Sequence, residues 1–138
     1  MLTANANAWE TAALVVLPHA PDDVILLQET KIFRERFRRT AASSARKLAW
    51  DPVLNLALPP LGTMGSAGCG VLGKIGTGIT QVDHRSIDNL CEHRVLVTWV
   101  AAVFKGGVHI ISVYLIDTVE LNESNKAILE AVAGVIKI

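Results

Sequence analysis

Residues 22–31 read Asp-Asp-Val-Ile-Leu-Leu-Gln-Glu-Thr-Lys. Four consecutive aliphatic side chains that run into a polar cluster indicate a short strand, buried on both faces, whose carboxyl end reaches an open rim. Glu29 stands at that end. Because an ionised carboxylate is costly to remove from water, we expect Glu29 to lie at a solvated strand end or beside a cation. Ligands bind at such strand ends in open α/β sheets.

The composition indicates one domain or part of one, with an unusually apolar character. The chain has 138 residues, of which 51% are hydrophobic, and its mean hydropathy is +0.38. This excess predicts strands covered on both faces, or apolar surface left exposed. The 13 basic and 13 acidic side chains cancel, so no global field attracts nucleic acid or acidic membranes. Any basic surface must therefore be local.

Three features of the sequence indicate in which cellular compartment the protein is located and whether it is embedded in a membrane. Cys69 and Cys91 match neither a zinc-binding pattern nor a disulfide framework, which favours a reducing environment. The early apolar run at residues 12–17 has no basic region before it, so we expect no signal peptide. The longest apolar stretch, residues 95–104, is too short to cross a bilayer as a helix. We therefore expect an intracellular protein that is not embedded in a membrane.

The periodicity of apolar residues predicts alternating strands and helices. The first three predicted elements are a strand, a helix and a strand, which is the order of a βαβ unit. The predicted strands are residues 2–6, 24–27, 70–74, 94–104 and 108–116. A glycine turn at residues 105–107 joins the last two. Residues 53–61 are predicted to be a connector or a short edge strand. The predicted helices are residues 9–19, 31–50 and 122–136.

The helix predicted at residues 31–50 has an apolar stripe and many basic residues on its other faces. Basic side chains near a candidate active rim are compatible with contacts to phosphate groups. The alternative is an ordinary solvated helix face, because charges opposite an apolar stripe are the usual pattern.

The glycine-rich segment after residue 62 matches two nucleotide-binding patterns in part. Residues 68–73 fit G-x-G-x-x-G, and residues 68–74 fit a P-loop up to its last position, where Ile75 offers no hydroxyl. Both motifs need a strand before them and a helix after them, and the surrounding glycines favour neither. We therefore predict a loop and a short strand here, with no helix at Ile75.

Four segments taken together resemble a known family. They are residues 3–9, 23–31, 66–72 and 112–115, which read TANANAW, DVILLQETK, SAGCGVL and SVYL. In this order they resemble the opening motifs of the endonuclease/exonuclease/phosphatase superfamily, and most closely the exonuclease III or apurinic endonuclease type carried by non-LTR retrotransposons. The Gln-Glu-Thr strand end is the most specific of the four.

The resemblance implies roles for particular residues. Glu29 would bind the catalytic Mg²⁺, with Mn²⁺ as an alternative ion, and Asn5 would position metal or phosphate; Asn7 is a weaker candidate for substrate binding. Tyr114 would be the catalytic tyrosine near the scissile phosphate. A hard dication prefers oxygen ligands, often only one or two carboxylates with water and substrate phosphate. The structural alternative is that Asn5 caps a turn, Glu29 is a solvated strand end and Tyr114 is a half-buried strand aromatic.

The resemblance also has limits. Ala8 stands where the family usually has glycine, and the later Gly-Asp-Phe-Asn motif, the later Asp and the final Asp-His pair have no counterpart. The resemblance therefore implies an α/β fold that is a partial four-layer α/β sandwich, with residues 1–138 as a single partial domain truncated at its C-terminus. We expect one mixed sheet with flanking helices and an open apolar inner face, built from residues 95–104 and 108–116, that promotes self-association.

The function that follows is the N-terminal part of a Mg²⁺-dependent endonuclease or phosphodiesterase of the retroelement type. Its substrate would be the DNA phosphate backbone, its partner the missing C-terminal half of the domain, and its location the nucleus. Alone, the chain is expected to be inactive. Two alternatives remain: a non-catalytic remnant or interaction module, and a phosphodiesterase of the same superfamily acting on inositol phosphate or lipid, because the shared metal chemistry does not encode the substrate.

Overall fold

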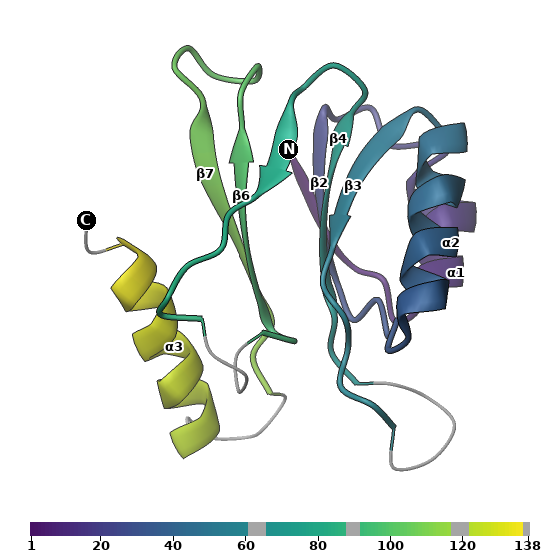
Figure 1. Cartoon of the computed structure of the whole chain (residues 1–138). Helices are drawn as coiled ribbons and strands as arrows, with labels where there is room; N and C mark the ends of the chain where they lie inside the picture. The colour runs from purple at the N-terminus through teal and green to yellow at the C-terminus, as the bar shows by residue number, and fades with distance from the viewer. Residues whose placement is uncertain (61–65, 88–91, 117–121, 137–138) are drawn as a thin grey trace.

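The computed structural model of the chain describes residues 1–60, 66–87, 92–116 and 122–136. Helices cover the outer faces of two sheets, which gives four layers (Figure 1). The helices are α1 (Trp9–Thr11), the π-helical turn η1 (Ala12–Val16), α2 (Glu35–Lys47) and α3 (Glu123–Ile136). The strands are β1 (Leu2–Asn5), β2 (Val24–Gln28), β3 (Trp50–Leu54), β4 (Cys69–Lys74), β5 (Ile79–Gln81), β6 (Val95–Val100) and β7 (Val108–Val113). The predicted α/β class and partial four-layer sandwich are confirmed.

The first sheet has the strand order β1-β2-β4-β3. Strand β2 pairs in parallel with β1 and antiparallel with β4, which makes the sheet mixed. Ile25 and Leu27 are fully buried on the face toward the helices, whereas Val24 is buried on the opposite face. The prediction that this strand is covered on both faces is therefore confirmed. Full burial of each such aliphatic side chain stabilises the fold by roughly 1.5–3 kcal/mol.

The first helical layer packs closely on this sheet because α2 presents small side chains to it. Ala41 and Ala45 are both buried in the cluster that contains Ile25 and Leu27. The indole Nε1 of Trp50 donates a hydrogen bond of 3.1 Å to the Leu17 carbonyl, which ties β3 to the end of the first helical segment. This layer and the first sheet thus share one core.

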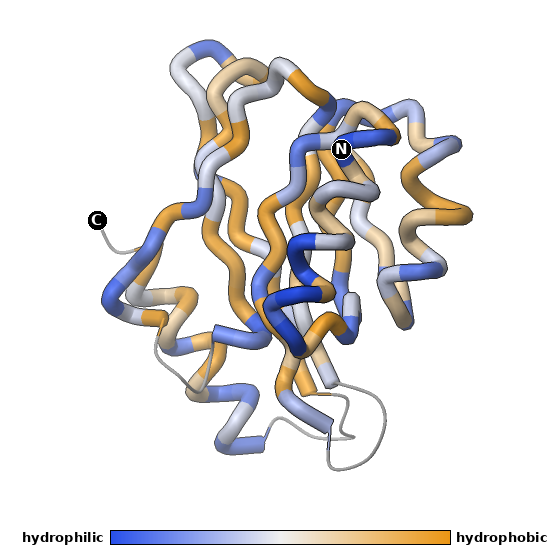
Figure 2. Tube along the Cα trace, turned by 45° about the vertical axis from the view of Figure 1, so that its right-hand side comes forward, coloured by the Kyte–Doolittle hydropathy of each residue, from blue (hydrophilic) through white to orange (hydrophobic). Residues whose placement is uncertain are grey.

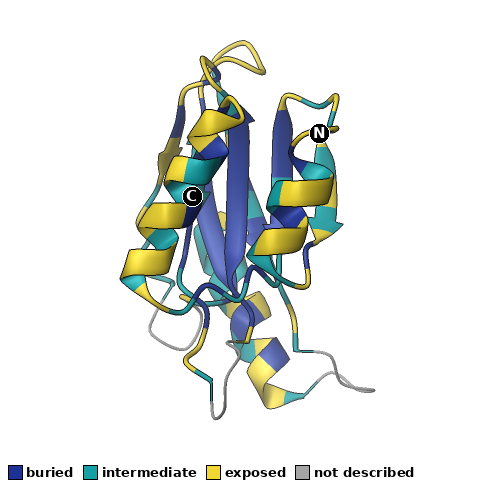
Figure 3. Ribbon diagram, turned by 90° about the vertical axis from the view of Figure 1, so that its right-hand side faces the viewer, coloured by how far each residue is buried: buried dark blue, intermediate teal, exposed yellow. Residues whose placement is uncertain are grey.

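The second sheet, β5-β6-β7, corrects an expectation from the sequence. We predicted one sheet with an open inner face, but the described strands form two sheets that pack face to face. Leu96 and Val100 of β6 and Ile110 of β7 pack with Val24 and Val71 of the first sheet. Figure 3 shows the central strands in the dark blue of buried residues. The inner face is therefore closed by the chain's own residues.

The outer face of the second sheet is covered by α3. Val95 and Val97, which alternate with the inward-facing residues of β6, pack with Ile128 of α3. Figure 2 shows the resulting concentration of hydrophobic residues along the strands. The predicted apolar surface on residues 95–104 and 108–116 is consequently wrong for the strands themselves, because both of their faces are covered. Within the described ranges, no helix has the length and apolar character needed to cross a membrane.

Two predicted helices differ from those observed. The helix predicted at 31–50 begins later, at Glu35, and ends at Lys47, because Lys31 and Ala49 both have left-handed backbones, with φ of 57° and 66°. Trp50 instead begins β3, the edge strand that the sequence placed at 53–61. The helix predicted at 9–19 is shorter and changes to π-helical geometry, with the Leu17 N–H bonded to the Ala12 carbonyl at 2.9 Å.

Two strand predictions also need revision. The strands predicted at 94–104 and 108–116 do form an antiparallel hairpin, but β6 ends at Val100, so the connection is longer than the predicted glycine turn at 105–107. Strand β5 was missed altogether, since its three residues carry no clear pattern.

The glycine segment is a loop followed by strand β4, as predicted. Ile75 lies in a turn, and no helix begins there. Gly70 lies between Leu27 of β2 and Leu54 of β3, in the interior of the sheet. The strand, loop and helix order that a phosphate-binding glycine motif requires is absent from this described segment.

Candidate functional site

The carboxyl ends of β1 and β2 meet at one rim because the two strands are parallel neighbours. Asn5, the last residue of β1, pairs with Gln28, the last residue of β2. Glu29 follows immediately and is half-buried, whereas Asn5 is exposed. Parallel pairing thus brings the two predicted metal-binding residues to the same edge of the first sheet.

Tyr114 reaches this rim from the second sheet. Its hydroxyl donates a 2.5 Å hydrogen bond to Oε1 of Glu29, which is 85 residues away in the sequence. Tyr114 directly follows β7, and its backbone N–H donates a 2.8 Å hydrogen bond to the Arg94 carbonyl, which extends the β6–β7 ladder. Hydrogen bonds to carboxylates are short and roughly twice as strong as neutral ones. The contact therefore links the two sheets at the candidate site.

Arg94 is a residue that the sequence reasoning missed. It lies opposite Tyr114, immediately before β6, and is only 8% exposed, with its guanidinium carbon 5.4 Å from the centre of the Tyr114 ring. Its Nη1 has no hydrogen-bond partner among the described residues. A buried guanidinium with an unused donor is costly. No pattern in the sequence marks this residue, because an arginine before a valine-rich strand usually lies in solvent.

The two asparagines form a separate group with Lys31. Oδ1 of Asn5 accepts a 2.9 Å hydrogen bond from the Asn7 backbone N–H, as in an Asx turn. Lys31 Nζ donates a 2.8 Å hydrogen bond to Oδ1 of Asn7. Asn5 therefore caps a turn, as the structural alternative proposed, and Asn7 is held by a lysine whose role the sequence did not reveal.

The backbone of the rim is strained. Asn7, Glu29 and Lys31 all have left-handed conformations, with φ of 55°, 56° and 57°. Such conformations cost non-glycine residues roughly 1–2 kcal/mol, although asparagine tolerates them better. The strain is maintained by neighbouring backbone, since the N–H groups of Thr30 and Lys31 donate to the carbonyls of Gly68 and Ala67 at 3.1 Å each. Strain that the surroundings impose is a feature of functional sites.

The loop before β4, which contains Ala67 and Gly68, packs against this rim. Gly68 has φ of +86°, and a Cβ there would lie 2.5 Å from Oγ1 of Thr30. A side chain at position 68 would therefore displace the residue next to Glu29. The loop that looked like a nucleotide-binding motif instead packs against the candidate site.

The oxygen atoms at the rim match the few ligands that a protein often provides to Mg²⁺. Glu29 supplies one carboxylate and Asn5 an amide oxygen, and such sites are commonly completed by water and substrate phosphate. Among the described residues, no three His, Cys, Asp or Glu side chains form a metal-binding group. Cys69 is not a candidate ligand, because burial raises the pKa of its thiol to about 12.

Comparison with solved structures places this geometry in context. The chain is similar to the 3′-5′ exonuclease NExo from Neisseria meningitidis, with 19% identity and a TM-score of 0.63 over 97% of this chain and 49% of that one. A variant of the 3′ phosphatase NExo from Neisseria, bound to a product DNA hairpin, gives the same values. The AP endonuclease LMAP from Leishmania major is 18% identical, with a TM-score of 0.55 over 83% of this chain and 39% of that one.

Comparisons with models of protein families and with curated proteins find no match. At this level of identity, the structural likeness establishes the fold alone. The chain spans about half the length of the solved structures that it matches. It therefore has the fold of about half of the 3′-5′ exonuclease NExo, a fold that the AP endonuclease LMAP shares.

Proposed function

We propose that the chain is the N-terminal half of a Mg²⁺-dependent phosphodiesterase that acts on DNA, of the retroelement endonuclease type and nuclear. The observation that supports this most is the 2.5 Å hydrogen bond from Tyr114 to Glu29. It fixes a carboxylate at the rim where two sheets meet, and it does so in a fold that DNA-processing enzymes share.

Each residue has a distinct part in this proposal. Glu29 and Asn5 would hold Mg²⁺ or Mn²⁺, and the bound ion supplies Lewis-acid polarisation of a phosphoryl oxygen. Tyr114 orients the Glu29 carboxylate and places a hydroxyl beside the phosphate, while Asn7 and Lys31 offer polar contacts to the substrate backbone. The group that positions the attacking water is assigned to the remaining half of the domain, so this chain alone does not hydrolyse phosphodiesters. Each such catalytic group typically contributes on the order of 10²-fold or more.

Metal binding tests the proposal without requiring activity. Mn²⁺ added to the ¹⁵N-labelled chain should broaden the amide NMR signals of residues 5, 29 and 114 first, because paramagnetic broadening is strongest near the ion. Glu29→Gln, which keeps the side-chain shape and removes the charge, should abolish this selectivity. Broadening centred on another acidic group, such as Glu35, or unchanged in Glu29→Gln, contradicts the assignment.

A nicking assay on supercoiled plasmid with Mg²⁺ tests the second part of the proposal. We expect no nicking by the wild-type chain, with Glu29→Ala as the control for contaminating nuclease. Nicking that Glu29→Ala abolishes would show that this half suffices for catalysis.

A second candidate function, a non-catalytic interaction module, is favoured by one observation. The side-chain oxygens of Asn5 and Asn7 already accept hydrogen bonds from within the chain. Under this alternative, Mn²⁺ broadens no rim signal selectively, and Glu29→Gln changes only stability. The same NMR titration therefore separates the two candidates.

A further inference from the structure

The N-terminal end of α2 and the residues before it carry two phenylalanines and two arginines that contact one another. We call Phe33, Arg34, Arg36 and Phe37 the Phe–Arg cluster. The two rings meet edge to face with centroids 6.5 Å apart. The Arg36 guanidinium carbon lies 4.6 Å from the Phe37 centroid, and that of Arg34 lies 5.2 Å from the Phe33 centroid. The cluster is thus a preformed arrangement of planar groups.

The arginines of this cluster differ from those further along α2, which lie beside carboxylates. Arg38 and Arg39 pair with Glu35, and Arg46 lies 3.8 Å from Asp51. Arg34 and Arg36 are exposed and form no ion pair with a described carboxylate. Cations near a helix N-terminus also oppose the helix dipole. Arg34 and Arg36 therefore place two unpaired cations at the N-terminal end of α2, where they do not favour helix stability.

A cavity of about 360 Å³ lies beside the cluster and next to the candidate site. Phe33, Phe37 and Trp9 contribute its aromatic walls, and Thr30 and Lys31 form its side toward the rim. Thr30 follows Glu29 in the sequence, and Lys31 is bonded to Asn7. The volume is within the range of roughly 300–1,000 Å³ that small-molecule sites occupy. A nucleotide held there would be adjacent to the proposed metal site.

We propose that the cavity and the Phe–Arg cluster bind an unpaired nucleotide of single-stranded DNA beside the phosphodiester that the enzyme processes. The proposal rests on the proposed function for the choice of DNA. The binding itself follows from the chemistry of the surface: aromatic rings stack on bases, guanidinium planes stack on bases or pair with phosphates, and uncompensated cations attract the backbone.

The chemistry favours a nucleic acid over a protein or a membrane. Phe37 is 44% exposed, and the guanidinium of Arg36 lies over its ring, so an accessible aromatic surface is bordered by a cation. A polyanion with exposed π faces complements both properties at once. Paired bases in a duplex do not present their faces, which is why the inference concerns an unpaired nucleotide.

Fluorescence anisotropy with a labelled, unstructured DNA oligonucleotide of about ten nucleotides tests the proposal. EDTA is present, so that binding does not depend on the proposed metal. The single strand should bind more tightly than a duplex of the same length. The double variant Phe33→Leu/Phe37→Leu keeps the apolar volume and removes the rings, and it should weaken single-strand binding at least about 5-fold. Arg34→Gln/Arg36→Gln should reduce the slope of log K against log salt by about 1.4.

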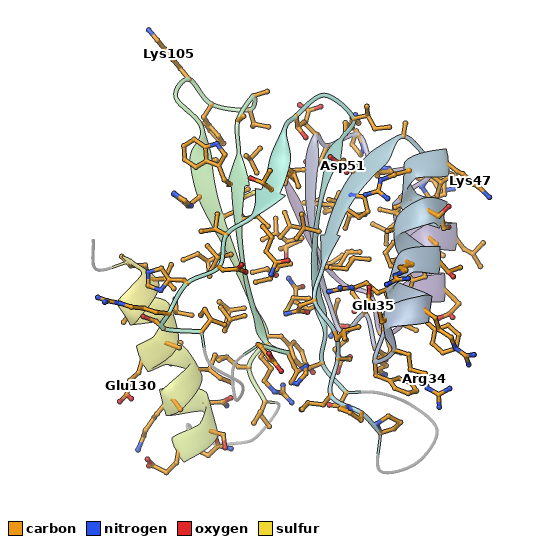
Figure 4. All side chains as sticks on the ribbon, in the orientation of Figure 1. Arg34, Glu35, Lys47, Asp51, Lys105 and Glu130 are labelled. Atoms are coloured by element: carbon orange, nitrogen blue, oxygen red, sulfur yellow. The ribbon has the colours of Figure 1, made fainter. Side chains whose placement is uncertain are left out.

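Lys47→Gln is the matched charge control, because Lys47 lies at the opposite end of α2 from Arg34 (Figure 4). It should change binding less than 2-fold, roughly the effect of one distant, screened charge. Thermal unfolding confirms that each variant is folded. An equal loss in Lys47→Gln, a duplex preference, unchanged binding by the leucine variant, or tighter binding of RNA of the same sequence or of anionic vesicles overturns the proposal.

Glu29→Ala separates this inference from the proposed function. Single-strand binding that persists in Glu29→Ala, together with the absence of selective Mn²⁺ broadening in the wild-type chain, would overturn the phosphodiesterase proposal and leave the nucleotide site standing. Selective Mn²⁺ broadening without single-strand binding would do the reverse.

Discussion

Two polar clusters share the rim but are held in different ways. The Glu29 cluster, which consists of Glu29, Tyr114 and Arg94, joins both sheets, and its members are half-buried or, for Arg94, buried. The Asn7 cluster, which consists of Asn5, Asn7 and Lys31, lies on one edge and is largely exposed. The position of Glu29 therefore depends on the packing of the sandwich, whereas the asparagines are held by a local turn and one lysine.

This difference has a consequence for function. A carboxylate held from two sheets keeps its position without substrate, as preorganised sites require. An exposed lysine and asparagine can exchange their hydrogen bond for one to a phosphate at little cost. We therefore expect substitutions in the Glu29 cluster to change the stability of the fold, and those in the Asn7 cluster to change it little.

The largest effect is expected from Arg94→Ala. It removes most of a buried side chain that packs on Tyr114, and the resulting cavity should lower the free energy of unfolding by about 2–4 kcal/mol. Arg94→Met fills most of the same volume without the charge. Because the Nη1 group has no described partner, this variant should stay within about 1 kcal/mol of wild type or exceed it.

Urea unfolding of the two Arg94 variants measures this difference. If the methionine variant loses as much stability as the alanine variant, the charge itself is needed. The Glu29 cluster would then be an ion-paired network and would not be held mainly by packing.

The next effect is expected from Tyr114→Phe, which removes one hydroxyl. The hydrogen bond to the Glu29 carboxylate is lost, and the free energy of unfolding should fall by about 1.5–3 kcal/mol, the range for hydrogen bonds to charged groups. A double-mutant cycle with Glu29→Gln should give a coupling energy above about 1 kcal/mol. The same cycle with Asn5→Ala should be additive within about 0.5 kcal/mol. Equal coupling in both cycles would show that the two clusters act as one.

A third prediction concerns Cys69, whose Sγ donates to the Arg94 carbonyl at 3.3 Å beneath the Glu29 cluster. Burial raises the pKa of this thiol from its ordinary 9.0 to about 12, so above pH 9 the unfolded chain loses the proton first. The stabilisation is complete below about pH 9 and is lost as the pH rises toward 12. Between pH 9 and 10, wild type should lose about 1 kcal/mol more stability than Cys69→Ala. Parallel pH profiles would show that the thiol titrates normally in the folded protein.

The sequence predicted the elements whose pattern is local. Four adjacent aliphatics identified β2, and the apolar stripe of residues 122–136 identified α3 to within one residue. Helix α2 was predicted too long because Ala49, without glycine's usual signal, takes the left-handed conformation that ends it. The second sheet was missed as a separate layer, because the sequence does not show which strands pair over long distances.

For the candidate site too, the sequence predicted the residues that belong to local motifs and missed those whose role depends on long-range packing. Glu29, Asn5 and Tyr114 were named from motifs, and parallel pairing and the hairpin account for their shared rim; their catalytic roles stay predictions. Arg94 could not be named, because its importance comes from burial by the other sheet. Lys31 is the last residue of the motif at residues 23–31, but only the fold shows that it hydrogen-bonds to Asn7, 24 residues away.

The smallest effect is expected from Lys31, in the Asn7 cluster. Lys31→Met removes the exposed hydrogen bond to Asn7 and should lower the free energy of unfolding by less than about 1 kcal/mol. Lys31→Gly removes the same bond but adopts φ of 57° without a Cβ clash, so it should be more stable than the methionine variant by about 0.5 kcal/mol, after the entropy cost of glycine is subtracted. Because both variants lose the same contact, their difference in urea unfolding reports the backbone strain at the rim. A methionine variant that equals or exceeds the glycine variant would mean that the left-handed conformation at Lys31 costs nothing. The rim would then be a relaxed turn, and the strain argument for a functional site would fail.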